Sequence, residues 1–176
     1  MTSDVRQTMT LADPFIAELQ QEAGTTRQML ERVPEDKLDW SPHAKSMTLG
    51  QLALHIATLP HAMCGLMEGD GLDAQDADFN AEQPTSKAQI LAGLDESIDV
   101  TARTLSAIGD QLATQTFKLT NGGAEIFTIP KVAMARSFLF NHWYHHRGQL
   151  SVYLRLLDVP VPVVYGRTAD ENPFAT

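Results

Sequence analysis

Three of the six histidines lie in one short stretch, FNHWYHHRGQL, at residues 140–150. His142 and His146 are four residues apart, which on an α-helix places them one turn apart on the same face. Imidazoles at this spacing can bind one metal ion through one ring nitrogen each, and such pairs recur in metalloproteins. The stretch therefore indicates a metal site, with hydrogen-bonded helical histidines as the ordinary alternative.

A divalent ion that is held firmly needs a third protein ligand, and His55 is the best candidate in the sequence. It lies beside the apolar stripe of a predicted helix, where its side chain can reach inward between helices. A lone histidine in such a place is more often a hydrogen-bonded core residue, so the pair carries more of the argument. Three neutral imidazoles leave one coordination position open for water, and chemistry can take place there.

The elements that must position these residues are helices. Apolar residues recur at steps of three and four in most of the chain, and proline, glycine and capping signals delimit the segments. We predict helices over about residues 13–33, 49–68, 86–108 and 131–158. Two short runs with β character flank Asn121-Gly122-Gly123 and predict a small hairpin or an extended loop between the third and fourth helices. The fold class is thus all-α, a four-helix bundle forming a single domain over residues 1–176.

The last helix has an apolar face that includes the histidine pair. His142 and His146 share this face with residues 135, 139, 150, 153 and 157, so we expect both rings to point into the bundle core. His145 lies on its flank, and Arg147 is placed on another part of the surface. A second apolar patch, typical of a central helix or a subunit interface, consists of Phe140, Trp143 and Leu154.

Two further residues of the last helix are candidates for cofactor binding. Gln149 could orient a ligand or a metal-bound water, or it could be a polar residue bonded to the backbone. Tyr153 faces inward beyond His146 and could donate a hydrogen bond to a substrate, although tyrosines in such places more often only pack. His43 and His61 are expected in loops or at the surface.

Composition limits the partners. The formal net charge is −9, with 13 Lys and Arg against 22 Asp and Glu, which argues against nucleic acid because such affinity depends on cation–phosphate attraction. The single cysteine, Cys64, excludes an internal disulfide. We find no signal peptide and no membrane-spanning apolar run. A cytoplasmic protein without membrane or nucleic-acid partners is expected.

Two segments and a short C-terminal motif resemble a known family. They are LDWSPHAKSMTLGQLALHIA (38–57), NHWYHHRGQLSVYLRLLDVPVP (141–162) and VYG (164–166). These resemble the DinB/YfiT-like superfamily, whose members are four-helix bundles with a three-histidine metal site. The resemblance implies that His55, His142 and His146 are metal ligands and that His145 is not. Similar proteins are often homodimers, so a homodimer is expected.

The resemblance also implies a metal-dependent enzyme acting on a small molecule, with two possible reactions. In transfer or isomerisation with a low-molecular-weight thiol, the open metal position holds the sulfur as thiolate. In hydrolysis, the ion lowers the pKa of bound water to about 7. No Asp or Glu stands at a helical spacing that would supply a general base, as in H-E-x-x-H, so the sequence weakly favours thiol chemistry.

A non-catalytic, stress-related metal-binding module is the alternative from another class. A structural ion normally has a closed shell of protein ligands, and three histidines do not close one. A fourth ligand from Asp73 or Asp76 would favour this alternative. Nitrogen ligands with water suit Zn, Ni, Fe or Mn, and the sequence does not distinguish these ions.

Overall fold

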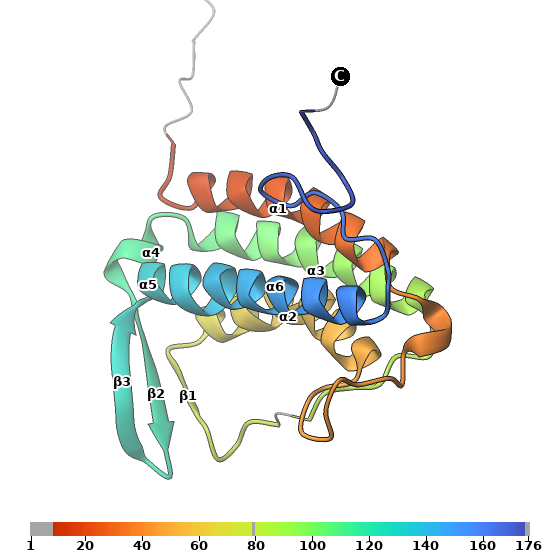
Figure 1. Ribbon diagram of the computed structural model, residues 1–176. Coiled ribbons are helices and arrows are strands. Elements are labelled where there is room, and N and C mark those ends of the chain that lie inside the picture. Colours follow the sequence, from red (N-terminus) through yellow and green to blue (C-terminus); the bar gives the residue numbers. More distant parts are fainter. Residues whose placement is uncertain (1–8, 79, 175–176) are drawn as a thin grey trace, which may run out of the picture.

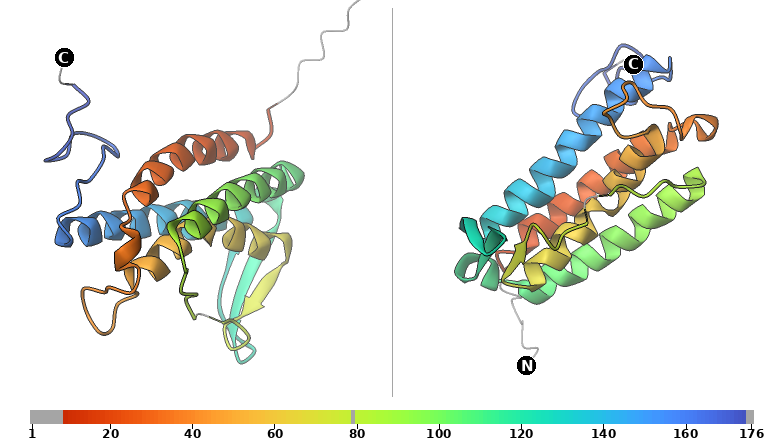
Figure 2. Two further views of the ribbon diagram at one scale, coloured as in Figure 1. Left: turned by 90° about the vertical axis from the view of Figure 1, so that its right-hand side faces the viewer. Right: turned by 90° about the horizontal axis from the view of Figure 1, so that it is seen from below.

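The computed structural model describes residues 9–78 and 80–174. Within them, four long helical segments pack side by side (Figure 1; Figure 2, right). They are α1 (Asp13–Glu31), α2 (Leu49–Glu68), α3 (Lys87–Ile108) and a composite last segment of α5 (Lys131–Met134), the π-helical stretch η2 (Ala135–Asn141) and α6 (His142–Leu156). Short turns η1 (Glu35–Lys37) and α4 (Gln111–Thr114) lie in the connections. The predicted helices are confirmed to within a few residues.

A small sheet accompanies the helices and makes the all-α prediction too narrow. The predicted hairpin is present as β2 (Thr116–Asn121) and β3 (Ala124–Pro130), and it extends from one end of the bundle (Figure 1). A third strand, β1 (Gly71–Asp73), pairs in parallel with β2. It has only three residues and no period of its own, so tertiary pairing rather than local pattern creates it. The chain is mostly helical with a three-stranded sheet.

Glycine and aspartate fix the place where β1 meets the hairpin. A Cβ on Gly71 would lie 2.5 Å from the carbonyl oxygen of Lys118, so only glycine allows this approach of the strands. Gly122 and Gly123 form the hairpin turn with φ of 59° and 79°, a region that glycine adopts readily. Their N–H groups donate to the carboxylate of Asp73 at 2.9 and 2.8 Å. The loop after α2 is thereby fastened to the hairpin.

The core lies between the four long segments, with α2 packed against α3 and α6, and α1 packed against α3 and α6. The face that the last segment turns to this core includes Ala135, Leu139 and Leu150 of the predicted face and is shifted toward the predicted second patch. Its fully buried apolar residues are Ala135, Leu139, Phe140, Trp143, Leu150 and Leu154. The predicted second patch is therefore core, which removes it as a reason to expect a subunit interface; the homodimer itself stays a prediction.

The histidine pair lies at the edge of the core, which corrects the prediction that both rings point into it. His142 and His146 are only half-buried. One reason is the π-helical stretch Ala135–Asn141, whose i→i+5 hydrogen bonds widen the turns and shift the helix face relative to a regular helix. The other is size, because burying the large ring of Trp143 removes more apolar surface from water than burying an imidazole.

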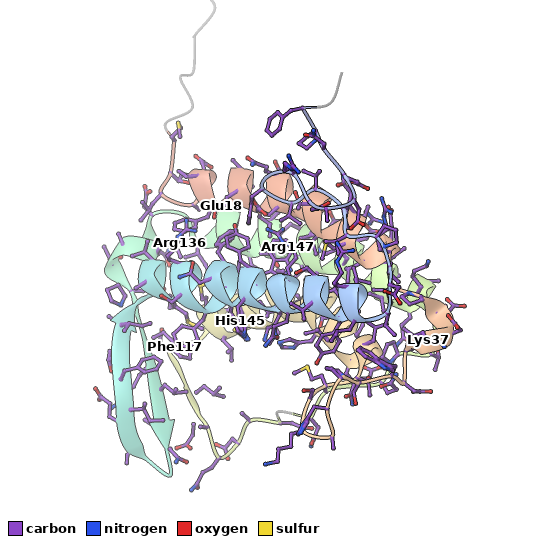
Figure 3. All side chains as sticks on the ribbon, in the orientation of Figure 1. Glu18, Lys37, Phe117, Arg136, His145 and Arg147 are labelled. Atoms are coloured by element: carbon purple, nitrogen blue, oxygen red, sulfur yellow. The ribbon has the colours of Figure 1, made fainter. Side chains whose placement is uncertain are left out.

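Arg147, predicted at the surface, is buried between α6 and α1 (Figure 3). Its guanidinium donates to the carboxylate of Glu22 and to the hydroxyls of Thr26 and Tyr165. Tyr165 in turn donates to Glu22 at 3.0 Å. Arg147 is only 2% exposed and Glu22 only 6%, so each charge is compensated in the interior. The HHRGQL and VYG motifs therefore meet on α1, which fastens the C-terminal segment to the bundle.

In the part of the chain that the structure describes, the helices are too short or too polar to cross a lipid bilayer.

Candidate metal centre and its cavity

The fold brings the three predicted histidines together. Each offers one ring nitrogen, and these atoms all lie within 4.8 Å of one another. The Nε2 atoms of His142 and His146 are 2.8 Å apart. The ring of His55, from α2, lies edge-on to that of His146 with centroids 4.6 Å apart. In the described residues this group consists of the three histidines alone, without a carboxylate.

Neighbouring groups orient the two rings of α6. Nδ1 of His146 lies 2.7 Å from Oε1 of Gln149, and because an amide oxygen only accepts, Nδ1 carries the hydrogen. The ring of His142 forms a hydrogen bond with the backbone of Phe138. Because its Nε2 atom faces His146, the Nδ1 atom is the one available for this bond. When both rings carry their hydrogen on Nδ1, the two Nε2 lone pairs point at each other. A cation between them would relieve this repulsion, and nitrogens on one tetrahedral ion lie about 3.3 Å apart, slightly wider than the 2.8 Å between these two atoms.

Burial keeps the three imidazoles neutral. Desolvation, followed by the neighbouring His146 and His142, lowers the pKa of His55 to about 4. Desolvation is also the main cause that lowers the pKa of His142 and of His146. Neutral imidazole is the form that binds metals, so this environment prepares the group for a cation.

A hydrogen bond between α2 and α6 sets the level at which the histidines meet. The indole N–H of Trp143 donates to the carbonyl of Ile56 at 2.9 Å. That carbonyl is free because its helical partner would be the N–H of Pro60, which proline lacks. Trp143 follows His142 in the chain and Ile56 follows His55, so the bond holds the two turns that carry these histidines side by side.

The start of α2 is fixed by a capping box. Gln51 N–H donates to the hydroxyl of Thr48, while the Gln51 side chain accepts from the N–H of Thr48. The same amide of Gln51 donates to the carbonyl of Ala81 at 3.1 Å. Tyr153, a predicted candidate for cofactor binding, donates to the carbonyl of Met47 at 3.2 Å. These bonds anchor the segments before α2 and before α3 close to His55.

A cavity of about 560 Å³ opens beside the three histidines. Its apolar wall includes Met47, Ala62, Met63, Leu66, Leu72 and Ala81. Asp78 and Asn80, from the loop between β1 and α3, supply the polar lining apart from the imidazoles. Its volume is typical of small-molecule sites. A smaller cavity of about 190 Å³ also reaches His55.

The remaining histidines and the two loop aspartates are not members of the group. His145 is exposed, on the side of α6 away from α1 (Figure 3), and His43 and His61 are exposed as expected. Asp73 is occupied by the hairpin amides, and Asp76 is exposed and outside the histidine group. Neither carboxylate closes the ligand shell, which weakens the argument for a structural ion.

Two features of the site were missed from the sequence. Pro60 interrupts a helix with an otherwise regular period, and this signal could have pointed to a free carbonyl at Ile56. Asp78 belongs to an acidic loop without any period, so nothing local distinguishes it from its neighbours. Its place in the cavity follows from the fastening of β1 to the hairpin, which is a tertiary contact.

The fold and the site define a class: a mostly helical protein whose three-histidine cluster could hold a metal ion. Three neutral nitrogen donors fit a divalent transition metal. The chain belongs to the DinB family, whose model matches residues 7–173, and the resemblance seen in the sequence is confirmed.

The chain is also similar to individual proteins. YrdA of Bacillus subtilis strain 168, an uncharacterized protein, is 24% identical over 163 residues, covering 90% of each chain. A DinB-like protein from Bacillus cereus ATCC 10987 is similar in structure with a TM-score of 0.64 and 25% identity, over 89% of this chain and 99% of that one. The DinB-like protein YjoA from Bacillus subtilis has a TM-score of 0.66 at 15% identity, over 87% of this chain and 97% of that one.

Proposed function

We propose that this protein is a metal-dependent enzyme that acts on a small molecule, with His55, His142 and His146 as the metal ligands. The observation that supports the proposal is the convergence of three imidazole nitrogens at the wall of a 560 Å³ cavity. A bound divalent ion would supply Lewis acidity, either holding a thiol as thiolate or lowering the pKa of water to about 7.

The protein's own contribution is to keep the three imidazoles neutral and to orient their ring nitrogens toward one another. Gln149 fixes the tautomer of His146, and the bond between Trp143 and Ile56 keeps the two helices in register. Three uncharged ligands leave the charge of a divalent ion uncompensated and favour an anionic fourth ligand from outside the chain. This donor set fits a reactive centre better than a structural ion, which normally has a closed protein shell.

Our first candidate reaction is group transfer or isomerisation with a low-molecular-weight thiol. The chain's own thiol is unsuited to the role, because Cys64 is fully buried and desolvation, with the nearby Glu68, raises its pKa to about 12. A sulfur nucleophile would therefore come from a separate molecule. The membership of the DinB family is consistent with this candidate.

Hydrolysis is the second candidate, and Asp78 is the observation that favours it. This carboxylate lines the same cavity as the histidines and could accept a proton from a water molecule that attacks the substrate. The sequence offered no such group at a helical spacing, and the loop supplies one.

Metal content tests the proposal at its foundation. Elemental analysis of tag-free protein should find about one ion per chain in the wild type and in His145→Ala, as expected for a site with three protein ligands. The ion should be lost in His55→Ala and in the His142→Ala, His146→Ala double variant. No ion in reconstituted wild type, or equal content in all four proteins, would sink the proposal.

Activity assays then separate the two reactions. Thiol-adduct formation and ester hydrolysis are measured on the metal-loaded wild type and on Asp78→Asn. Hydrolysis that disappears in Asp78→Asn supports the second candidate. Thiol transfer that survives this substitution supports the first.

A further inference from the structure

The cavity beside the histidines has a chemical character that bears on the substrate. Its walls are built from methionine, leucine and alanine side chains. Three of them, Ala62, Met63 and Leu66, follow one another along α2 beyond His55. Among the described lining residues none is Lys or Arg, and the one carboxylate is Asp78.

Away from the histidines, such a lining discriminates against anionic groups. A carboxylate or phosphate that lies against this part of the wall, out of reach of a metal ion at the histidines, loses its hydration and gains no ion pair, which is costly. Here it would also meet the negative charge of Asp78. Sites that bind anions supply Arg, Lys or a row of backbone N–H groups. The described residues that line this cavity include neither Arg nor Lys.

Asp78 is itself held in place within the loop. Its Oδ1 accepts from the backbone N–H of Asn80 at 2.9 Å and from the Asn80 amide at 2.7 Å. These bonds hold the carboxylate within the loop, at the rim of an otherwise apolar space. A neutral molecule avoids the electrostatic penalty, and its apolar part gains from contact with α2.

We propose that this cavity selects a small molecule whose polar reactive group lies at the three histidines and whose remaining part is uncharged, apolar and lies against Ala62, Met63 and Leu66. The inference rests on the proposed metal-dependent function but holds for either reaction. In thiol transfer the apolar molecule is the acceptor of the sulfur. In hydrolysis it is the compound that water cleaves.

Three hydroxamates with one metal-binding group and different tails test this selection. They are acetohydroxamate, hexanohydroxamate and the monohydroxamate of adipic acid, which ends in a carboxylate. Calorimetric titration of zinc-loaded protein should show hexanohydroxamate binding about tenfold or more tighter than acetohydroxamate, since each fully buried methylene contributes up to about fourfold. The carboxylated probe should lose this gain.

A charge reversal in the wall provides the matched control. Ala62 is exposed on α2 and lines the cavity, so substitution there should spare the core. Ala62→Lys should make the carboxylated probe the tighter of the two six-carbon compounds. Ala62→Met, of similar length but uncharged, should retain the wild-type order.

The outcomes separate this inference from the proposed function. Equal affinity for the three probes, or tighter binding of the carboxylated one to wild type, would overturn the selection while leaving the metal site intact. Should zinc fail to bind, the cavity is tested in metal-free protein by displacement of Nile red. Hexanol should then displace the dye at lower concentration than hexanoate, and the reverse order would refute the inference without reference to the metal.

Discussion

The indole N–H of Trp143 donates to the carbonyl of Ile56 at 2.9 Å, and each residue is the chain neighbour of one candidate metal ligand. Pro60 explains why this carbonyl is free to accept, because it removes the N–H that would otherwise close the turn of α2. The indole N–H of Trp143 thus replaces the hydrogen bond that Pro60 removes from α2. The pair joins α2 to α6 at the level where His55 meets His142.

Trp143→Phe should therefore affect both stability and metal binding. It leaves the buried carbonyl of Ile56 without a donor, which costs about 1–3 kcal/mol in free energy of unfolding. The two helices lose their register bond, so zinc affinity should fall as well. Chemical denaturation measures the first effect, and competition with a chromophoric chelator measures the second.

A second substitution separates the hydrogen bond from the loss of ring volume. Pro60→Ala restores an N–H that can donate to Ile56 within α2. In this background, Trp143→Phe should cost about 1 kcal/mol less than in the wild type, as coupled residues do in a double-mutant cycle. If the two substitutions are simply additive, the carbonyl left by Pro60 is not what Trp143 satisfies.

Gln149 should tune metal affinity without supporting the fold. Its Oε1 accepts from Nδ1 of His146, and loss of such an outer partner typically weakens metal binding about 10–100-fold. Gln149→Leu should show this loss, while Gln149→Glu keeps an acceptor and should bind at least as tightly as wild type. Because Gln149 is exposed, unfolding free energies should change by no more than about 0.5 kcal/mol. Wild-type zinc affinity in Gln149→Leu would contradict this role.

The three-histidine cluster could be predicted from the sequence because the pair on α6 follows from local spacing and His55 is implied by the resemblance to the DinB family. His142 and His146 share a helix face whatever packs against it, and His55 lies in a helix with a regular apolar period. The direction in which that face points could not be predicted in the same way. It depends on the π-helical turns before His142 and on competition with Trp143 for the interior.

The residues of the cavity wall could not be predicted from local sequence patterns, for a different reason. Asp78 belongs to a loop with few apolar residues. Leu72 belongs to β1, which exists only through its pairing with β2. The local sequence likewise predicts a surface position for Arg147. Its burial depends on Glu22, far away in the chain, which provides the opposite charge. Contacts between distant segments decide these positions, and a single sequence contains no period that reports them.

Glu22→Ala should destabilise the fold while sparing the metal site. Removing one partner of a buried ion pair leaves the guanidinium of Arg147 uncompensated, which typically costs about 3–5 kcal/mol. The matched control is Asp95→Asn, which breaks an exposed pair with Arg27 and should cost less than about 1 kcal/mol. Urea denaturation compares the two variants.

Metal content distinguishes this effect from that of Trp143→Phe. Arg147 contacts α1, whereas the histidines of α6 face His55 on α2. Folded Glu22→Ala should still bind about one zinc ion per chain, as a three-ligand site allows. A loss of zinc from the folded variant would mean that the buried ion pair also positions the ligands.

Asp73 should give the hairpin contact a dependence on pH. Hydrogen bonds from Gly123, Gln75 and Gly122 lower the pKa of its carboxyl from the ordinary value of 3.8 to about 2. Because the pKa is lowered in the folded state, the stabilisation is fully present above pH 3.8 and is lost as the pH falls toward 2. An NMR titration should find a midpoint of about 2 at the Gly122 and Gly123 amides, absent in Asp73→Asn. A midpoint at the ordinary value would show that the carboxylate is not held by these amides.

The same residue connects the hairpin with substrate selection, because Leu72 lines the cavity and directly precedes Asp73. Asp73→Ala removes the acceptor for both glycine amides, so β1 should separate from the hairpin turn and the wall at Leu72 should loosen. At neutral pH the variant should therefore bind hexanohydroxamate more weakly, while acetohydroxamate, whose short tail does not reach this wall, should bind as in the wild type. Equal losses for both probes would instead place the effect of Asp73 at the histidines, and no loss for either would show that the wall stands without the hairpin.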